Sequence, residues 1–218
     1  MSFKSLMKFF VAFSVALIIT FIVYSINIYF STTESVSMNV KDVKDECQIE
    51  RSEEPKTLIL GEGQVTANEA QSWAQSNNAH QRFIDICPIY WTYGKLTGIR
   101  PDLLYCQAAH ETNFGHYGRH VTPDQNNWSG IKKIDGITGP GSHENFDTPE
   151  DGVRAHFNHM CAYTDRQPIG KPHDRYQIVL KKGYKIKYVE ELGGKWAISQ
   201  DYGIGLVNLL NKLITFKR

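Results

Sequence analysis

The chain has 218 residues, of which 41% are hydrophobic and 22% are charged, and its formal net charge is +1. There is no basic excess of the kind that nucleic-acid binding requires, so no nucleic-acid partner is expected. The four cysteines are scattered and form no CxxC pair. The sequence therefore indicates neither a zinc site nor a thioredoxin-like redox centre, and we expect no metal and no organic cofactor.

Residues 9–30 form an apolar stretch, and no charged residue occurs between Lys8 and Glu34. The stretch is long enough to span a bilayer. Its apolar core is longer than that of a cleaved signal peptide and no clear A-x-A site follows it, so an uncleaved single-pass anchor is favoured over late cleavage and release. Lys4 and Lys8 precede it and the first charge after it is acidic, which predicts that residues 1–8 are cytoplasmic and the rest of the chain is extracytoplasmic.

Residues 31–57 are rich in charge and contain no aromatic residue. This composition predicts a solvated extracytoplasmic stalk. Residues 58–218 are numerous enough to form one domain with its own core.

Helices are predicted along residues 58–218. Thr66 and Glu69 form a capping-box signature at the start of the first one. A second carries an apolar face from Phe83 to Leu96, with Pro88 at a kink or a late start.

The third predicted helix covers the segment RPDLLYCQAAHETN, in which Pro101 suits the first helical position and Gly115 suits the stop. A fourth opens at Thr148 and Pro149, and a last one follows Tyr202. Between the third and the fourth, residues 120–147 are rich in Gly, Asn, Asp and Pro and predict turns or a short hairpin. The domain is therefore expected to be mostly helical.

One carboxylate stands out in the third helix. Leu104, Ala108 and Glu111 are spaced i, i+4 and i+7, which puts them on one helix face, normally the face toward the core. A carboxylate there is either paired, for which Arg119 and Lys132 are the candidates, or has its pKa raised by burial and by the negative end of the helix dipole. A carboxyl group that stays protonated near neutral pH can serve as a general acid.

Four motifs follow one another: QAAHETNFG, NNWSGIK, FDTPEDGVRAHFNHMCAY and GGKWAISQDYGIGLVNLL. In this order they resemble the glucosaminidase domains of glycoside hydrolase family 73, which are bacterial cell-wall enzymes. The likeness extends from about residue 58 to residue 213. It implies a lysozyme-like α+β fold for residues 58–218. It also implies a peptidoglycan hydrolase, an endo-β-N-acetylglucosaminidase that cuts the GlcNAc-β-1,4-MurNAc bond of the glycan strands.

The resemblance assigns roles by motif match. It makes Glu111 the catalytic acid, and it places Asn127, Trp128 and Gly130 in a turn that lines the cleft beside it.

Trp196 and Tyr202 are implied at the cleft edge. There aromatic faces can stack on sugar rings, and the tyrosine hydroxyl can form a hydrogen bond near the reacting centre. A plain core position is the alternative for Trp196.

A second catalytic group is less clearly indicated, because many family members carry a second glutamate in a hairpin longer than the one here. The candidates are Glu144, Asp147 and Asp135. Glu144 is preferred since it follows a Gly-rich stretch that can fold over a cleft, whereas Asp147 could equally cap the helix at Pro149. The N-acetyl group of the substrate could also assist and replace a second residue.

Other hypotheses remain open. A lytic transglycosylase or muramidase would share the fold, and the short segment between Ile131 and Phe146 fits a wall-binding module without catalysis. His156 and His159 are spaced i and i+3 on a helix, but no third ligand is apparent, so they are expected on a solvated polar face rather than in a metal site. The sequence indicates the membrane and peptidoglycan as partners and leaves protein partners open.

Overall fold

The protein's structure is a computed structural model, and it describes Ser25 and residues 55–118, 120–134 and 136–216. The chain divides into two units, Met1–Glu54 and Pro55–Arg218. Apart from Ser25, the predicted anchor at 9–30 lies outside the described residues, as does the predicted stalk up to residue 54. Within the described part, no helix has both the length and the apolar character needed to cross a membrane.

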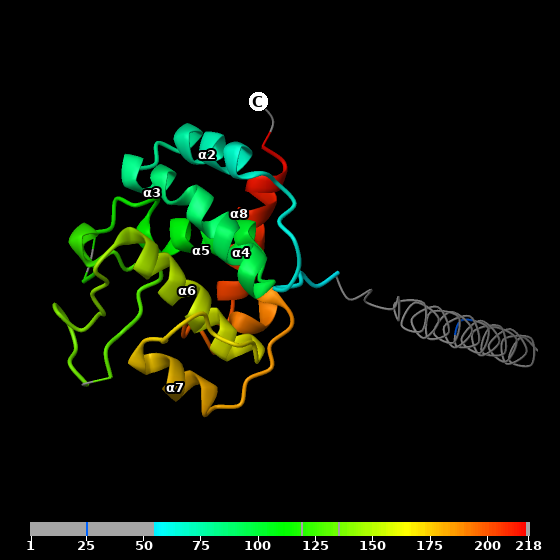
Figure 1. Ribbon diagram of the computed structural model, residues 1–218. Helices are drawn as coiled ribbons and strands as arrows, with labels where there is room; N and C mark the ends of the chain where they lie inside the picture. Colours follow the sequence, from blue (N-terminus) through cyan, green and yellow to red (C-terminus); the bar gives the residue numbers. More distant parts are fainter. Residues whose placement is uncertain (1–24, 26–54, 119, 135, 217–218) are drawn as a thin grey trace, which may run out of the picture. The chain divides into compact units, whose positions relative to one another are not determined.

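The second unit is built from helices (Figure 1). In chain order they are α2 (Ala67–Ser76), α3 (Gln81–Asp85), α4 (Cys87–Thr97), α5 (Pro101–Thr112), the 3-10 helix η1 (Pro123–Gln125), α6 (Pro149–Thr164), α7 (Asp174–Leu180), the 3-10 helix η2 (Val189–Leu192) and α8 (Tyr202–Ile214). Strand pairing among the described residues is limited to isolated bridges, such as Lys132 with His143. The prediction of a mostly helical domain is confirmed.

The helix starts follow local chemistry. The Thr66 Oγ1 accepts a hydrogen bond from the Glu69 backbone N–H, and the Glu69 carboxylate accepts one from the Thr66 backbone N–H, so the predicted capping box is present. The predicted second helix is in fact two helices, α3 and α4, which meet at Ile86. Pro88 lies in the first turn of α4, where a missing backbone N–H has no helical partner to lose.

Helix α5 lies in the middle of the unit and packs against α4 and α8 (Figure 1). Every residue from Pro101 to Ala109 is buried. The sequence pattern predicted one face turned toward the core, but the helix is enclosed on all sides until its last turn. It ends at Thr112, before the predicted stop at Gly115, because Asn113 adopts the left-handed conformation with φ of 49°.

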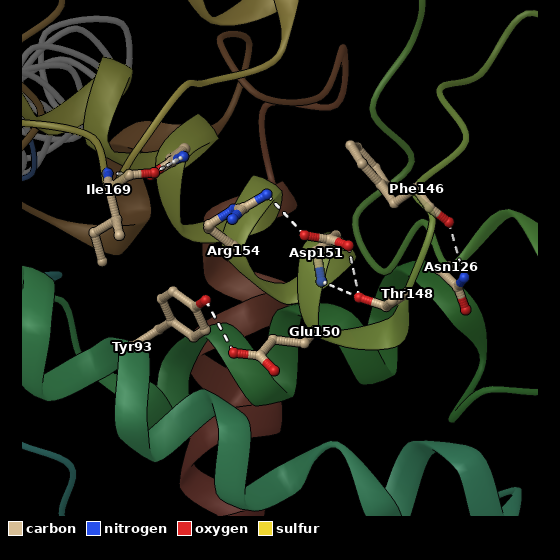
Figure 2. Close-up of polar contacts among 9 residues, drawn as sticks. Tyr93, Asn126, Phe146, Thr148, Glu150, Asp151, Arg154 and Ile169 are labelled. Atoms are coloured by element: carbon tan, nitrogen blue, oxygen red, sulfur yellow. Dashed lines mark hydrogen bonds and ion pairs between the residues drawn. The ribbon is translucent and has the colours of Figure 1, made fainter.

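The first turn of α6 is fixed by side-chain contacts (Figure 2). Thr148 is the N-cap, and its Oγ1 accepts a hydrogen bond of 3.1 Å from the Asp151 backbone N–H. The hydroxyl of Tyr93 on α4 donates to Glu150 at 3.3 Å. The first contact caps α6, and the second holds its start against α4.

The segment between α5 and α6 rests on this first turn. The Asn126 side chain donates to the Phe146 carbonyl at 2.8 Å (Figure 2), which ties the two ends of the segment together. Gly152 of α6 lies directly under the turn, because a Cβ added there would be 1.8 Å from the Asn126 carbonyl oxygen and 2.9 Å from the Trp128 ring. A glycine at 152 therefore lets the turn approach the helix backbone.

Candidate active site

A cavity of about 650 Å³ opens at the C-terminal end of α5. Its walls come from the last residues of α5, the turn at Ser129 and Gly130, the bridged residues Lys132 and His143, and Trp196. The volume is in the range of small-molecule sites.

Glu111 lies in the last turn of α5, at the point where the buried helix reaches the cavity. Its Oε1 accepts two hydrogen bonds, from the Tyr202 hydroxyl at 2.5 Å and from the Trp196 indole Nε1 at 3.1 Å. No described residue donates to Oε2. A Cβ at Gly130 would lie 3.7 Å from this second oxygen, so the glycine keeps the approach to Oε2 open. The hydrogen bonds to Oε1 thus fix the orientation of the carboxyl group, and Oε2 remains accessible beside Gly130.

The surroundings of Glu111 favour its protonated form. Glu111 is exposed where it opens into the cavity, but neighbouring protein atoms still desolvate its carboxyl group, and this desolvation raises its pKa above the ordinary 4.5. The hydrogen bond from Tyr202, the charge of His110 and the hydrogen bond from Trp196 lower the pKa, but they offset only part of the shift. The prediction of a raised pKa is supported, and a carboxyl group in this state can donate a proton.

The structure shows no ion pair of Glu111 with the described one of its two predicted partners, Lys132. Lys132 lines the same cavity, but it forms no salt bridge with Glu111 in the described structure. Arg119 lies outside the described residues. The side-chain partners that the structure shows for Glu111 are the neutral donors Tyr202 and Trp196.

The cavity wall is otherwise basic or neutral. Among its described lining residues, Glu111 is the one acidic side chain, whereas Lys132 and three histidines, His110, His120 and His143, also line it. A site with one carboxyl group and several nitrogen donors suits a ligand rich in oxygen acceptors.

Asn127 and Trp128 are fully buried and do not line the cavity. The Asn127 side chain accepts from the Ile131 backbone N–H and donates to the carbonyls of Ile131 and Glu144, at 2.9–3.0 Å. The Trp128 indole donates to the Pro149 carbonyl at 3.1 Å. Both residues therefore hold the turn that places Gly130 beside Glu111, and contact of either with a ligand stays a prediction.

The candidates for a second catalytic group do not line the cavity where the structure describes them. Glu144 is half-buried, and its backbone N–H donates to Ile131 at 2.8 Å. Asp147 is exposed, and it does not cap α6, because Thr148 has that role. Asp135 lies outside the described residues. The catalytic roles of these three residues stay predictions.

Trp196 and Tyr202 both reach Glu111, from the loop before α8 and from the first position of α8. Trp196 lines the cavity, and its ring also packs against His156, His159 and Tyr163. It therefore lies both at the cavity and against core residues, so the two predicted positions do not exclude each other. Tyr202 is buried, and its hydroxyl bonds to two side chains of α5, because it accepts from Gln107 and donates to Glu111.

Sequence reasoning missed the polar residues beneath the site. His156 and His159 were expected on a solvated face, which is wrong, because both are buried. His156 bonds to Gln107, which in turn bonds to the Tyr202 hydroxyl. The available signal was Gln107, a polar residue one helical turn before Glu111 in a helix of small and apolar side chains. In the described part of the chain, no three His, Cys, Asp or Glu side chains are arranged to hold a metal ion.

Comparisons with known proteins place the chain in a family. The family model for mannosyl-glycoprotein endo-beta-N-acetylglucosaminidase, named Glucosaminidase, matches residues 87–215, which is more than half of the chain. An uncharacterized protein of Borreliella burgdorferi is 27% identical over 121 residues. Those residues are 56% of this chain and 58% of the relative, so the chain spans little more than half of that protein. No solved structure matches the chain.

The matched region runs from the start of α4 through α8 and so includes Glu111, Gly130, Trp196 and Tyr202. The chain therefore belongs to the mannosyl-glycoprotein endo-beta-N-acetylglucosaminidase family.

Proposed function

We propose that the protein is a peptidoglycan hydrolase with a lysozyme-like fold, an endo-β-N-acetylglucosaminidase that cleaves the GlcNAc-β-1,4-MurNAc bond of bacterial cell-wall glycan. The observation that carries the proposal is the placement of Glu111. It is the one acidic side chain among the described residues that line the cavity, and its pKa is raised by desolvation. Family membership supports the substrate class.

In the proposed reaction Glu111 is the general acid. It donates its proton from Oε2 to the glycosidic oxygen, and the bond from that oxygen to the anomeric carbon breaks. The carboxylate that remains keeps the hydrogen bonds from Tyr202 and Trp196 to Oε1. Donors that are already in place stabilise the developing charge without reorganisation.

For the second half of the displacement, we favour the acetamido group of the substrate. Its carbonyl oxygen would attack the anomeric carbon as the glycosidic bond breaks, and water would then open the resulting ring with Glu111 as the base. The support is that neither Glu144 nor Asp147 lines the cavity. This route retains the anomeric configuration, whereas direct attack by water inverts it.

We further propose that residues 9–30 anchor the enzyme in the cell membrane and residues 31–57 act as an extracytoplasmic stalk. The support is the uncharged apolar stretch and the lysines before it. A tether of this kind would let the catalytic unit reach the wall while it stays attached to the membrane.

The test is digestion of purified peptidoglycan by the full chain beside Glu111→Gln, with reduced products identified by mass spectrometry. Loss of a general acid lowers turnover by about 10²- to 10⁴-fold, and glutamine preserves the shape of the side chain. New reducing-end N-acetylglucosamine that disappears in the variant is the expected result. Reducing or 1,6-anhydro muramic ends would instead indicate a muramidase or a lytic transglycosylase, and equal turnover by both proteins would remove Glu111 from the mechanism.

The same assay decides the second group. Glu144→Gln and Asp147→Asn each remove one negative charge outside the cavity lining. A loss as large as that of Glu111→Gln in either variant would make that residue the second catalytic group. Proton NMR of the first-formed anomer separates the two routes by retention or inversion.

A further inference from the structure

A buried chain of hydrogen bonds runs from α4 to the proposed catalytic carboxyl group. The Tyr90 hydroxyl contacts His156 Nδ1 at 2.9 Å, His156 Nε2 contacts Gln107 Oε1 at 3.0 Å, Gln107 Nε2 donates to the Tyr202 hydroxyl at 2.9 Å, and that hydroxyl donates to Glu111 at 2.5 Å. Tyr90, Gln107 and His156 have no exposed surface. Sequence motifs predicted a role only for the last two members of the chain.

The direction of each hydrogen bond follows from its partners. Because Gln107 donates to Tyr202 with Nε2, its carbonyl Oε1 faces His156 and can only accept, so His156 Nε2 carries a hydrogen. His156 Nδ1 is then a free acceptor, and it takes the hydrogen of the buried Tyr90 hydroxyl. Burial lowers the pKa of His156 to about 3, which keeps the ring in this neutral form.

All donors in the chain consequently point toward Glu111. The hydrogen of the Tyr202 hydroxyl has Glu111 Oε1 as its acceptor, because the Tyr202 oxygen already receives the hydrogen from Gln107. A Gln107 amide rotated by 180° would offer its carbonyl oxygen to Tyr202 and would compete with Glu111 for that hydrogen. The rotation would also turn the Gln107 N–H₂ group toward His156 Nε2 and so require the other His156 tautomer, whose Nδ1–H would leave the hydrogen of the buried Tyr90 hydroxyl without this acceptor.

We propose that Tyr90, His156 and Gln107 are positioning residues for Glu111. Their oriented hydrogen bonds commit the Tyr202 hydroxyl to Glu111 Oε1, which leaves Oε2, the oxygen beside Gly130, to carry the proton that is delivered to the substrate. This inference rests on the proposed role of Glu111 as the acid. It adds three residues that do not line the cavity.

The effect on the reaction has a definite sign. A committed donor at Oε1 stabilises the carboxylate that forms when the proton leaves, and it lowers the Glu111 pKa against the effect of desolvation. Loss of a bond from the hydrogen-bond chain should therefore slow the chemical step and raise the Glu111 pKa. Substrate binding should change little, because the three residues do not line the cavity.

Matched variants test the inference in the full chain. Tyr90→Phe removes the first hydroxyl of the hydrogen-bond chain. His156→Phe removes both ring nitrogens while it keeps an aromatic ring against Trp196. Tyr105→Phe is the control. Tyr105 is equally buried, and its hydroxyl donates to the Phe83 carbonyl at 3.0 Å, so it is not part of the hydrogen-bond chain. The control therefore distinguishes the effect of losing any buried hydroxyl from the effect of breaking the hydrogen-bond chain to Glu111.

We expect kcat to fall by about three- to tenfold in Tyr90→Phe and His156→Phe, with KM nearly unchanged, because one or two modest hydrogen bonds are lost. The alkaline limb of the rate profile should move up by roughly half a pH unit, since a Glu111 with a higher pKa stays protonated longer. Tyr105→Phe should show neither change. Equal kcat values and equal profiles for Tyr90→Phe and Tyr105→Phe would overturn the inference.

A second measurement does not depend on turnover. Glutamate labelled with ¹³C in the side-chain carboxyl group reports the Glu111 titration by NMR in the full chain in detergent micelles, and the signal is assigned by its absence from Glu111→Gln. A pKa that rises in Tyr90→Phe but not in Tyr105→Phe supports the inference even if the wild type cuts no peptidoglycan, a result that would defeat only the proposed function. Identical titrations in the two variants would overturn the inference whether or not the wild type is active.

Discussion

At the scale of single residues, the raised pKa of Glu111 predicts a stability change in Glu111→Gln. A carboxyl group whose folded pKa lies above its unfolded value disfavours folding at higher pH, and the penalty vanishes below the unfolded pKa, near 4.5. The neutral glutamine avoids the penalty and can still accept hydrogen bonds from Tyr202 and Trp196. The variant should therefore be more stable than the wild type at pH 7.5.

Urea unfolding at several pH values checks this prediction. The difference in the free energy of unfolding between the variant and the wild type should shrink as the pH falls toward 4.5. A difference that is independent of pH would show that the charge of Glu111 does not destabilise the fold.

The sequence pointed to Glu111 because a carboxylate stood in a helix of small and apolar side chains, and the structure puts it at the cavity. Gln107 and His156 were not recognised, because a buried amide or imidazole that satisfies its hydrogen bonds leaves no periodic signal. Their partners come from helices α4, α5, α6 and α8, and that proximity exists only in the folded chain.

At the scale of elements, the starts of α2, α5 and α6 were predictable because caps and prolines act locally. The break between α3 and α4 was only partly predictable, since Pro88 permits either a kink or a new start. The enclosure of α5 on every side could not be read from its sequence, because periodicity reports a face and not the number of neighbours. The close approach of the Asn126 turn to Gly152 was equally hidden.

Replacement of two helix glycines by alanine, at Gly152 and at Gly205, should change the stability in opposite directions. In Gly152→Ala the new methyl group would clash with the Asn126 carbonyl oxygen, and the turn that carries Gly130 would have to move. Overpacking of this kind lowers the free energy of unfolding by about 1–3 kcal/mol, and a displaced Gly130 should also reduce turnover. Gly205 in α8 has open space around it, so Gly205→Ala should stabilise the protein by about 0.5–1 kcal/mol.

Thermal unfolding and peptidoglycan digestion of both variants check this pair. Equal melting temperatures for Gly152→Ala and Gly205→Ala would contradict the contact between α6 and the turn. Normal turnover by a destabilised Gly152→Ala would show that the position of Gly130 is not critical.

At the scale of the whole molecule, the core extends beyond the region that identifies the family. The family match begins at residue 87, yet Trp73 of α2 and Phe83 of α3 are buried in the same hydrophobic cluster as the helices inside it. The sequence predicted a domain from about residue 58, because the capping box and the apolar spacing of α2 are local signals. His156 and His159, which local signals did not place in the interior, are buried against this cluster, and the half-buried His173 contacts His159 at 3.0 Å.

These histidines should make the folded unit sensitive to acid. Burial lowers the pKa of His156 to about 3, lowers that of His159 well below the ordinary 6.5, and lowers that of His173 to about 4. Below pH 6.5 the unfolded chain binds protons at these positions while the folded chain does not, so stability is lost as the pH falls. Each such histidine reduces the free energy of unfolding by about 1.4 kcal/mol per pH unit in this window.

Glu111 acts in the opposite direction, but it is one group against these three histidines and His143, whose pKa is also lowered by burial. Urea unfolding at pH 7.5 and at pH 5.5 should therefore show a marked loss of stability in acid. His156→Phe should reduce the slope of stability against pH by one proton, whatever its effect on stability at pH 7.5. A slope equal to that of the wild type would mean that His156 is protonated in the folded protein, and the direction of the buried hydrogen-bond chain would then be wrong as well.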